Sequence, residues 1–213
     1  MKVITTLGDM AEYILKLTQP MGLVPTMGSL HQGHLELINR SCSENVSTIV
    51  SIFVNPLQFL PNEDFDKYPR DLDRDLEILK KANVDTVFIP TVTEFYPSDF
   101  STYIDVEKFS KKLEGKSRPG HFRGVATVVG KLLILCRPDY AYFGQKDAQQ
   151  VLLIRQMNRD LNLGVSIVTV PTVRDVDGVA FSSRNKYLSN SERKAARVLY
   201  QSLLAVQEVK SNS

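Results

Sequence analysis

The fold is decided by one short stretch, Met21-Gly22-Leu23-Val24-Pro25-Thr26-Met27-Gly28-Ser29-Leu30-His31-Gln32-Gly33-His34. Residues 21–25 are apolar and predict a buried strand, and the spacing of apolar residues after His34 predicts a helix to about residue 45. The turn between such a strand and helix is where α/β folds bind phosphates, because unpaired backbone N–H groups and the positive helix dipole lie there. His31 and His34 stand in this turn and can donate hydrogen bonds to phosphate oxygens. The stretch therefore predicts a phosphate site.

Two other interpretations of the histidine pair stay open at this point. His31 and His34 could supply two ligands to zinc, although no cluster of Cys and His elsewhere in the sequence completes a set. They could also be an idle pair of histidines in a surface turn. The pair alone does not choose between these interpretations and a phosphate site.

Length and composition are those of one sizeable globular domain. The chain has 213 residues, of which 43% are hydrophobic and 23% charged, and its net charge is +2. Basic residues alternate with acidic ones, which argues against a nucleic-acid surface. No apolar run is long enough for a membrane span, and the first residues lack the core of a signal peptide. Because Cys42 and Cys136 are expected to be buried, reduced thiols, we expect a cytoplasmic protein.

Strands and helices alternate along the sequence. After the first core strand, further strands are expected over residues 46–54, 84–89, 140–143 and 165–170. Helices are expected over residues 10–17, 71–82, 125–136, 151–161 and 189–209, and a mobile basic loop over residues 115–124. In the helix over residues 71–82, we expect Leu72, Leu76 and Leu79 to face the core. The alternation predicts an α/β fold with a doubly wound parallel sheet.

Polar side chains gather where these strands are expected to end. The sequence places His31 and His34, Asn55 and Gln58, Lys146 and Asp147, and Ser182 and Arg184 directly after predicted strands or in the loops that follow. In a doubly wound sheet, ligands bind beyond the carboxyl ends of the strands. Each pair alone could be a helix cap or an ordinary loop. Together they predict one site along a single edge of the sheet.

The residue types at this edge suit a nucleotide and a small acid. Lys146 offers a cation to phosphate, and Asp147 can reach a ribose hydroxyl or a magnesium ion. The run Phe181-Ser182-Ser183-Arg184-Asn185 supplies hydroxyl, guanidinium and amide donors for phosphate. Asn55, Gln58 and Gln150 are neutral amides, which can orient a hydroxyl or carboxylate of a small polar substrate. The loop carrying Arg118, His121 and Arg123 could close over an anion or could be a solvated loop.

These stretches resemble the pantothenate synthetase (pantoate–β-alanine ligase) family of the HIGH-type, Rossmann-like nucleotidylyltransferase superfamily. The resemblance covers essentially the whole chain, and the blocks occur in the order of that family. They are residues 24–34, Phe53-Val54-Asn55-Pro56-Leu57-Gln58-Phe59, Tyr68-Pro69-Arg70, Arg118-Pro119-Gly120-His121-Phe122-Arg123-Gly124, Phe143-Gly144-Gln145-Lys146-Asp147-Ala148-Gln149-Gln150 and Ser182-Ser183-Arg184-Asn185.

The resemblance implies a reaction of ATP with (R)-pantoate to give pantoyl adenylate, followed by attack of β-alanine to give pantothenate and AMP. It implies catalytic roles for His34 (proton donor), His31 and Lys146, and substrate contacts for Gln58 and Gln150, to which the residue types add Asn55. Magnesium is expected with ATP, with Asp147 as the nearest protein ligand. The residues implied to contact ATP are Met27, Gly28, Ser29, Leu30, His31, Gln32, Gly33, His34, Gly144, Gln145, Lys146, Asp147, Val173, Phe181, Ser182, Ser183 and Arg184.

The sequence departs from the family pattern at two places. Phe181 stands where the family usually has Met, which we expect to leave nucleotide binding intact. The family also carries a smaller C-terminal lid domain, so we expect residues 1–187 to form the nucleotide- and pantoate-binding domain and residues 188–213 to be the first helix of a truncated lid. That helix is expected to expose Val198, Leu199, Leu203 and Val206. The resemblance further suggests a homodimer.

Other functions remain as alternatives. A nucleotide-binding fragment without activity would keep the fold but lack the lid that excludes water from the acyl adenylate. A transferase of AMP to a phosphorylated acceptor would need cations where this sequence has Gln58 and Gln150. A transfer-RNA synthetase is disfavoured, because the sequence has neither an anticodon-binding module nor a basic face.

Overall fold

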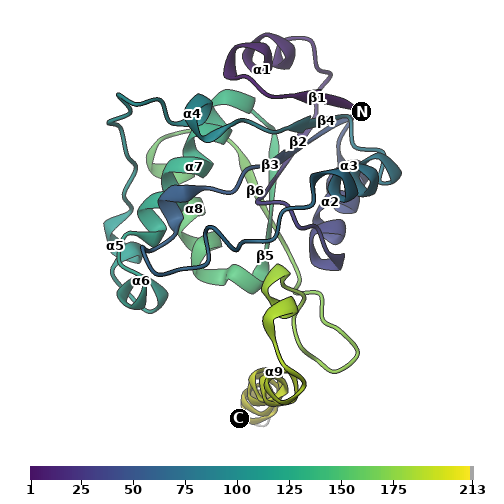
Figure 1. Ribbon diagram of the computed structural model, residues 1–213, viewed down its shortest axis with the longest axis vertical. Coiled ribbons are helices and arrows are strands. Elements are labelled where there is room, and N and C mark those ends of the chain that lie inside the picture. Colours follow the sequence, from purple (N-terminus) through teal and green to yellow (C-terminus); the bar gives the residue numbers. More distant parts are fainter. Residues whose placement is uncertain (212–213) are drawn as a thin grey trace.

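The computed structural model describes residues 1–211 and shows a parallel sheet between two layers of helices (Figure 1). The six strands lie in the order β1-β4-β3-β2-β5-β6. Their bounds are β1 Lys2–Ile4, β2 Met21–Thr26, β3 Ser47–Ile52, β4 Thr86–Phe88, β5 Tyr140–Gly144 and β6 Ser166–Val170. The helices are α1 Leu7–Ile14, α2 Gln32–Glu44, α3 Leu72–Lys81, α4 Val92–Phe95, α5 Glu107–Ser110, α6 Glu114–Ser117, α7 His121–Cys136, α8 Ala148–Asp160 and α9 Asn190–Ser211.

Each face of the sheet has its own apolar core. Side chains of α1, α7 and α8 pack on one face, where Met10, Phe122 and Ile154 are buried. Side chains of α2 and α3 pack on the other, where Ile38 and Leu79 are buried. The chain winds outward from β2 through β3 to β4 and then returns to β5 beside β2. The direction of winding therefore reverses between β2 and β5, which is where doubly wound sheets bind their ligands.

The predicted parallel sheet and its alternating helices are confirmed; β3, β4 and β6 are shorter than expected, and β2 and β5 are each one residue longer. Strand β1 was not predicted, because it is only three residues long and lies at the sheet edge with Val3 exposed. In α3 the expected apolar stripe is wrong at one position, since Leu72 is 43% exposed. Asp75 is buried instead, because its carboxylate accepts hydrogen bonds from the N–H groups of Ser29 and Leu30. Of the two cysteines, both unpaired, Cys136 is buried as expected but Cys42 only partly so.

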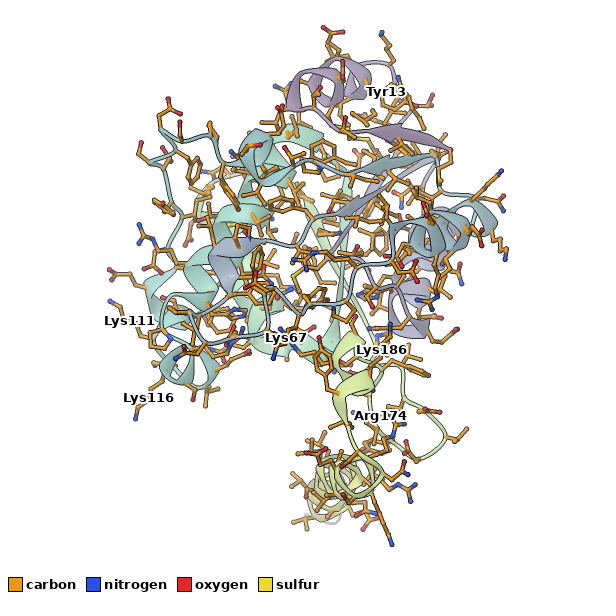
Figure 2. All side chains as sticks on the ribbon, in the orientation of Figure 1. Tyr13, Lys67, Lys111, Lys116, Arg174 and Lys186 are labelled. Carbon is orange, nitrogen blue, oxygen red and sulfur yellow. The ribbon has the colours of Figure 1, made fainter. Side chains whose placement is uncertain are left out.

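The prediction of a mobile basic loop over residues 115–124 is also wrong. This segment contains α6 and the first turn of α7. The guanidinium of Arg118 pairs with Glu63 at 2.6 Å and with Glu114 at 2.9 Å, and His121 is buried with its Nδ1 2.7 Å from the carbonyl oxygen of Gln58. Lys116 projects outward from the surface (Figure 2). The basic groups are therefore neutralised or directed away from the sheet edge.

Helix α9 stands apart from the sheet in Figure 1. It begins with the expected capping box, in which the N–H of Ser189 donates to Glu192 and the N–H of Glu192 donates to the Ser189 hydroxyl. The expected apolar side chains of α9 are indeed exposed. The helix is tied to the preceding loop by ion pairs of Arg193 and by Arg174 (labelled in Figure 2), whose guanidinium lies 3.9 Å from the centre of the Tyr200 ring. Among the described residues, no helix has both the length and the apolar character to span a bilayer.

Candidate active site

The turn that follows β2 has an unusual backbone. Gly28 and Ser29 both adopt positive φ, at 78° and 50°. Their conformation turns the N–H groups of Ser29 and Leu30 to one side, where both donate to the carboxylate of Asp75, at 2.7 and 2.8 Å. The N–H of Gly28 donates to the hydroxyl of Thr26. The turn is therefore held by side chains of the protein itself.

The two histidines cap α2 reciprocally. The N–H of Gly33 donates to Nδ1 of His31 at 3.1 Å, and the N–H of His31 donates to Nδ1 of His34 at 3.3 Å. The rings stack with their centroids 3.9 Å apart. This is a capping box in which imidazoles replace the usual hydroxyl and carboxylate. Because both Nδ1 atoms accept hydrogen bonds, the proton of each neutral ring lies on Nε2.

Both rings are uncharged at neutral pH. Burial, with smaller contributions from His31 and Lys146, lowers the pKa of His34 to about 3. Burial and the charge of Lys146 lower the pKa of His31 to about 4. The backbone N–H groups of Gly28, Ser29, Leu30, His31 and Gly33 already donate within the protein. The expectation that unpaired backbone N–H groups of this turn face the ligand therefore fails at these five residues, and the Nε2–H groups are left as donors.

Lys146 and Asp147 lie opposite the histidines, in a single 3₁₀ turn after β5. Both side chains are exposed, and Lys146 Nζ donates to Asp147 at 2.8 Å. A cavity of about 120 Å³ opens between the two loops. Its lining includes His31, Gly33, His34, Gly144, Lys146, Asp147, Gln150, Val173 and Phe181. Eight of the predicted nucleotide residues, from the segments that follow β2, β5 and β6, therefore line one cavity: His31, Gly33, His34, Gly144, Lys146, Asp147, Val173 and Phe181.

The run after β6 reaches the same region from the other side. The buried hydroxyl of Ser183 donates to the carbonyl oxygen of Ser29, which joins this run to the turn after β2. The Ser182 hydroxyl caps the 3₁₀ helix Ser183–Tyr187 by accepting from the N–H of Arg184. Arg184 forms a two-pronged ion pair with Asp64, at 2.9 and 2.8 Å. The predicted phosphate donor Arg184 is thus already engaged by a carboxylate.

A second cavity of about 150 Å³ adjoins the first. Gln58, Gln150 and His34 supply polar groups to its wall, and Val125, Val128, Val129 and Leu132 of α7 supply an apolar patch. Asn55 also lines it, but its amide is buried and donates to Gln58 Oε1 and to the Gly124 carbonyl, while its oxygen accepts from the Tyr96 hydroxyl. Asn55 therefore orients Gln58. A Cβ at Gly124 would lie 2.1 Å from the Leu57 carbonyl oxygen, so this close approach requires glycine.

The two cavities share His34, Asp147 and Gln150. Gln32 and Gln145 are exposed at helix starts and line neither cavity. Leu30 is in the core, and Gly28 and Ser29 face a separate cavity on the α3 side. The zinc alternative finds no support, since residues 1–211 contain no group of three or more His, Cys, Asp or Glu side chains that could hold a metal.

Sequence comparison now adds to this geometry. The profile of the family described as Pantoate-beta-alanine ligase matches residues 2–213. A pantothenate synthetase of Acetivibrio thermocellus is 55% identical over 212 residues, which are 98% of this chain and 75% of that protein. The chain belongs to the pantoate–β-alanine ligase family. A second family member, the pantothenate synthetase of a Roseiflexus species, is 57% identical over 208 residues, 98% of this chain and 75% of that one.

Solved structures of pantoate–β-alanine ligases have the same fold. Pantothenate synthetase from Thermus thermophilus superposes with a TM-score of 0.96 at 51% identity, covering all of this chain and 76% of that one. The ligase from Francisella tularensis, complexed with β,γ-ATP and β-alanine, superposes with a TM-score of 0.89 at 42% identity, covering 94% of this chain and 78% of that one. This chain thus spans about three quarters of the length of these ligases.

Two acidic residues at the site were not predicted from the sequence. Asp75 and Asp64 contact predicted site residues directly, yet in the sequence they read as ordinary surface acids. One signal was available for Asp75, because it occupies a helical position adjoining Leu76 and Leu79 on the inward side of α3. Asp64 lies in a loop without periodicity, so no pattern pointed to it.

Proposed function

We propose that this chain condenses (R)-pantoate with β-alanine, using ATP and passing through pantoyl adenylate. Family membership supports the reaction class, and the observation that carries the assignment is the pair of adjoining cavities that share His34, Asp147 and Gln150. One cavity has cationic and N–H donor groups suited to phosphates. The other has neutral amides beside an apolar patch, which suits the hydroxyl, carboxylate and two methyl groups of pantoate.

In the first step, a carboxylate oxygen of pantoate attacks the α-phosphorus of ATP. A P–O bond forms, and the bond to the β-phosphate breaks and releases pyrophosphate. Neutral His31 and His34 donate hydrogen bonds through Nε2–H to phosphate oxygens, and Lys146 supplies positive charge as the leaving group gains negative charge. The family resemblance implied that His34 is a proton donor. In this proposal His34 is an uncharged ring that donates a hydrogen bond and keeps its proton.

In the second step, the amine of β-alanine attacks the acyl carbon of the adenylate. The new C–N bond replaces the C–O bond to AMP, AMP leaves with the bonding electrons, and the amine releases its proton to solvent. Gln58 lies where it can contact both the acid and the incoming amine, with its carbonyl side oriented by Asn55. Holding both reactants in one cavity lowers the entropic part of the barrier.

We propose that magnesium accompanies ATP. Asp147 is a single carboxylate that already accepts from Lys146, so this chain fits a metal held chiefly by the triphosphate with one protein oxygen nearby. Magnesium supplies charge neutralisation of the phosphates. The residues of this chain orient the triphosphate against the acid.

We propose three further properties. The family resemblance suggests a homodimer. A cytoplasmic location agrees with ATP as substrate and with two unpaired cysteines. We infer that residues 1–187 form the domain that binds nucleotide and pantoate, and that α9 begins a separate unit, since it stands apart from the sheet (Figure 1).

Isotope exchange between pyrophosphate and ATP, run with and without pantoate, tests the proposal. Exchange that requires pantoate supports the adenylating ligase. ATP binding without exchange would instead indicate a nucleotide-binding fragment. Exchange supported by another acceptor would indicate a nucleotidyltransferase.

A further inference from the structure

Asp75 is a buried carboxylate that takes no part in the two proposed reaction steps. It is 1% exposed, on the face of α3 that packs against the sheet. Both carboxylate oxygens are used: Oδ2 accepts from the N–H of Ser29 at 2.7 Å and Oδ1 from the N–H of Leu30 at 2.8 Å. Burial raises the pKa of Asp75, and these two hydrogen bonds oppose the rise. An apolar side chain at this position would avoid the cost of burying a charge.

The two N–H groups form an anion-binding concavity. Neighbouring N–H groups in a turn can point into one hollow that binds an anion, and in the turn with Gly28 and Ser29 at positive φ the N–H groups of Ser29 and Leu30 converge in this way. In this chain the hollow is filled by a carboxylate of the protein. The fit is close, because a Cβ at Gly28 would lie 3.0 Å from Asp75 Oδ2 and 3.1 Å from Ile52.

Holding the 28–30 turn in place also positions the two histidines, because they follow it directly in the backbone. Leu30 is followed directly by His31, whose own N–H fixes His34 and whose ring caps Gly33. The other side of the turn is held by Ser183, which donates to the Ser29 carbonyl. Asp75 therefore holds the rear of a turn whose front carries the two imidazoles and the edge of the nucleotide cavity.

We propose that Asp75 is a positioning residue for adenylate formation: its carboxylate occupies the anion hollow of the 28–30 turn and so fixes the direction of the His31 and His34 Nε2–H groups. This inference rests on the proposed function for its catalytic consequence. The triphosphate then meets side chains in front of the turn, and the hollow behind it is not a phosphate site.

Asp75→Asn tests the proposal, with Asp73→Asn as the matched control. The substitution keeps the size of the side chain but turns an NH₂ group toward one of the two N–H donors. We expect kcat/KM for ATP in the exchange reaction to fall by between about tenfold and a hundredfold, as for a misplacement of about 1 Å. The pantoate dissociation constant should stay within about twofold of the original, since Asp75 does not line the acid cavity. Asp73 is exposed one half-turn earlier on α3, and its variant should match the original protein in all respects.

A second readout needs no turnover. In the original protein, NMR titration should find His31 and His34 as Nε2–H tautomers with pKa values near 4 and 3. In Asp75→Asn both pKa values should rise toward the ordinary value, because the rings lose their fixed, desolvated arrangement. Gly28→Ala, which crowds Asp75 without removing its charge, should produce the same two changes.

Three results would overturn the inference. Tighter ATP binding by Asp75→Asn would make the hollow a phosphate site from which Asp75 is displaced. Equal losses for ATP and pantoate, in proportion to a lowered melting temperature, would make Asp75 a structural residue only. Unchanged histidine titration in both variants would show that the turn does not depend on Asp75. Absence of exchange in the original protein would count against the proposed function, while the titration would still decide the role of Asp75.

Discussion

At the scale of single residues, the site depends on imidazoles that are donors without being cations. A neutral ring with its proton on Nε2 can hold a phosphate oxygen and does not change charge between pH 6 and 8, since the pKa values of His31 and His34 lie near 4 and 3. If both rings were protonated, their positive charges would repel each other, because the ring centroids are only 3.9 Å apart. The sequence predicted that the two histidines lie together where a helix begins, and their phosphate ligand stays a prediction. It could not predict their charge, which follows from burial and from the reciprocal cap.

Two substitutions can separate the hydrogen bond donated by His34 Nε2–H from the other contributions of the imidazole ring. His34→Ala removes the Nε2–H group, and we expect the rate of pantoyl adenylate formation to fall by about 10²–10³-fold, the usual cost of a donor to a transition state. His34→Gln retains an N–H donor at similar reach and should recover part of that loss. Rapid-quench measurement of the adenylate decides the matter, with circular dichroism as the control for folding. Formation at the original rate in His34→Ala would remove the assigned role.

The same pKa values predict how stability depends on pH. In the unfolded chain a histidine takes up a proton near pH 6.5, whereas in the folded chain His31 does so near 4 and His34 near 3. Between these limits the unfolded state binds more protons, so the free energy of unfolding should fall as the pH is lowered from about 6.5 to about 4. Urea denaturation at pH 7 and pH 5 measures the fall. It should be smaller in His31→Gln/His34→Gln, and an identical fall would show that the rings are not buried as neutral groups.

At the scale of elements, strands and helices with long apolar patterns were predictable and short or irregular ones were not. The β2-to-α2 junction, α7 and α8 have enough buried residues to show their period. Strand β1 has three residues at the sheet edge, too few for a period. The basic residues near 118 looked like a solvated loop because their partner, Glu63, is distant in sequence. Ion pairs between residues distant in sequence do not change the local pattern of polar and apolar residues.

The segment between β3 and α3 carries two acids that hold arginines on either side of the site. Glu63 pairs with Arg118, Asp64 pairs with Arg184, and the carbonyl of Lys67 (labelled in Figure 2) accepts from the Tyr187 hydroxyl. The Asp64 carboxylate occupies the guanidinium fork that a phosphate would use. We expect Asp64→Asn to free Arg184 and lower KM for ATP by up to about fivefold, the scale of an exposed ion pair.

Two controls sharpen this test. Asp66→Asn removes an exposed acid from the same segment and should leave KM for ATP unchanged. The effect of Asp64→Asn should also shrink as salt is raised, because salt screens exposed ion pairs. A higher KM for ATP in Asp64→Asn would mean that the carboxylate orients Arg184 for the phosphates and does not compete with them.

At the scale of the whole molecule, α9 is the part whose apolar surface has least cover. Leu199 and Leu203 are 70% and 60% exposed on a helix that contacts the preceding loop through Arg193, Arg197 and Tyr200. Exposed apolar side chains of this size favour association between chains, because burying them removes apolar surface from water. We therefore expect residues 1–213 to associate in a concentration-dependent way through this face. Leu199→Glu/Leu203→Glu should weaken that association at least about tenfold in sedimentation velocity experiments, since each burial contributes more than about 1 kcal/mol.

The Leu199→Glu/Leu203→Glu substitutions should not affect the two cavities of the proposed active site. Leu199 and Leu203 line neither substrate cavity, so ATP binding by the double variant should equal that of the original chain. Gln201→Glu adds one negative charge on the side of α9 opposite Leu199 and Leu203, since consecutive helical residues are about 100° apart, and it should leave association intact. If the double variant associates as strongly as the original, the contact between chains uses another face. In that case α9 would be stabilised by its own capping box and by its contacts with the preceding loop, which are the ion pairs of Arg193 and Arg197 and the stacking of Arg174 on Tyr200. Arg193→Ala should then lower the helix content, a loss that circular dichroism at 222 nm would register.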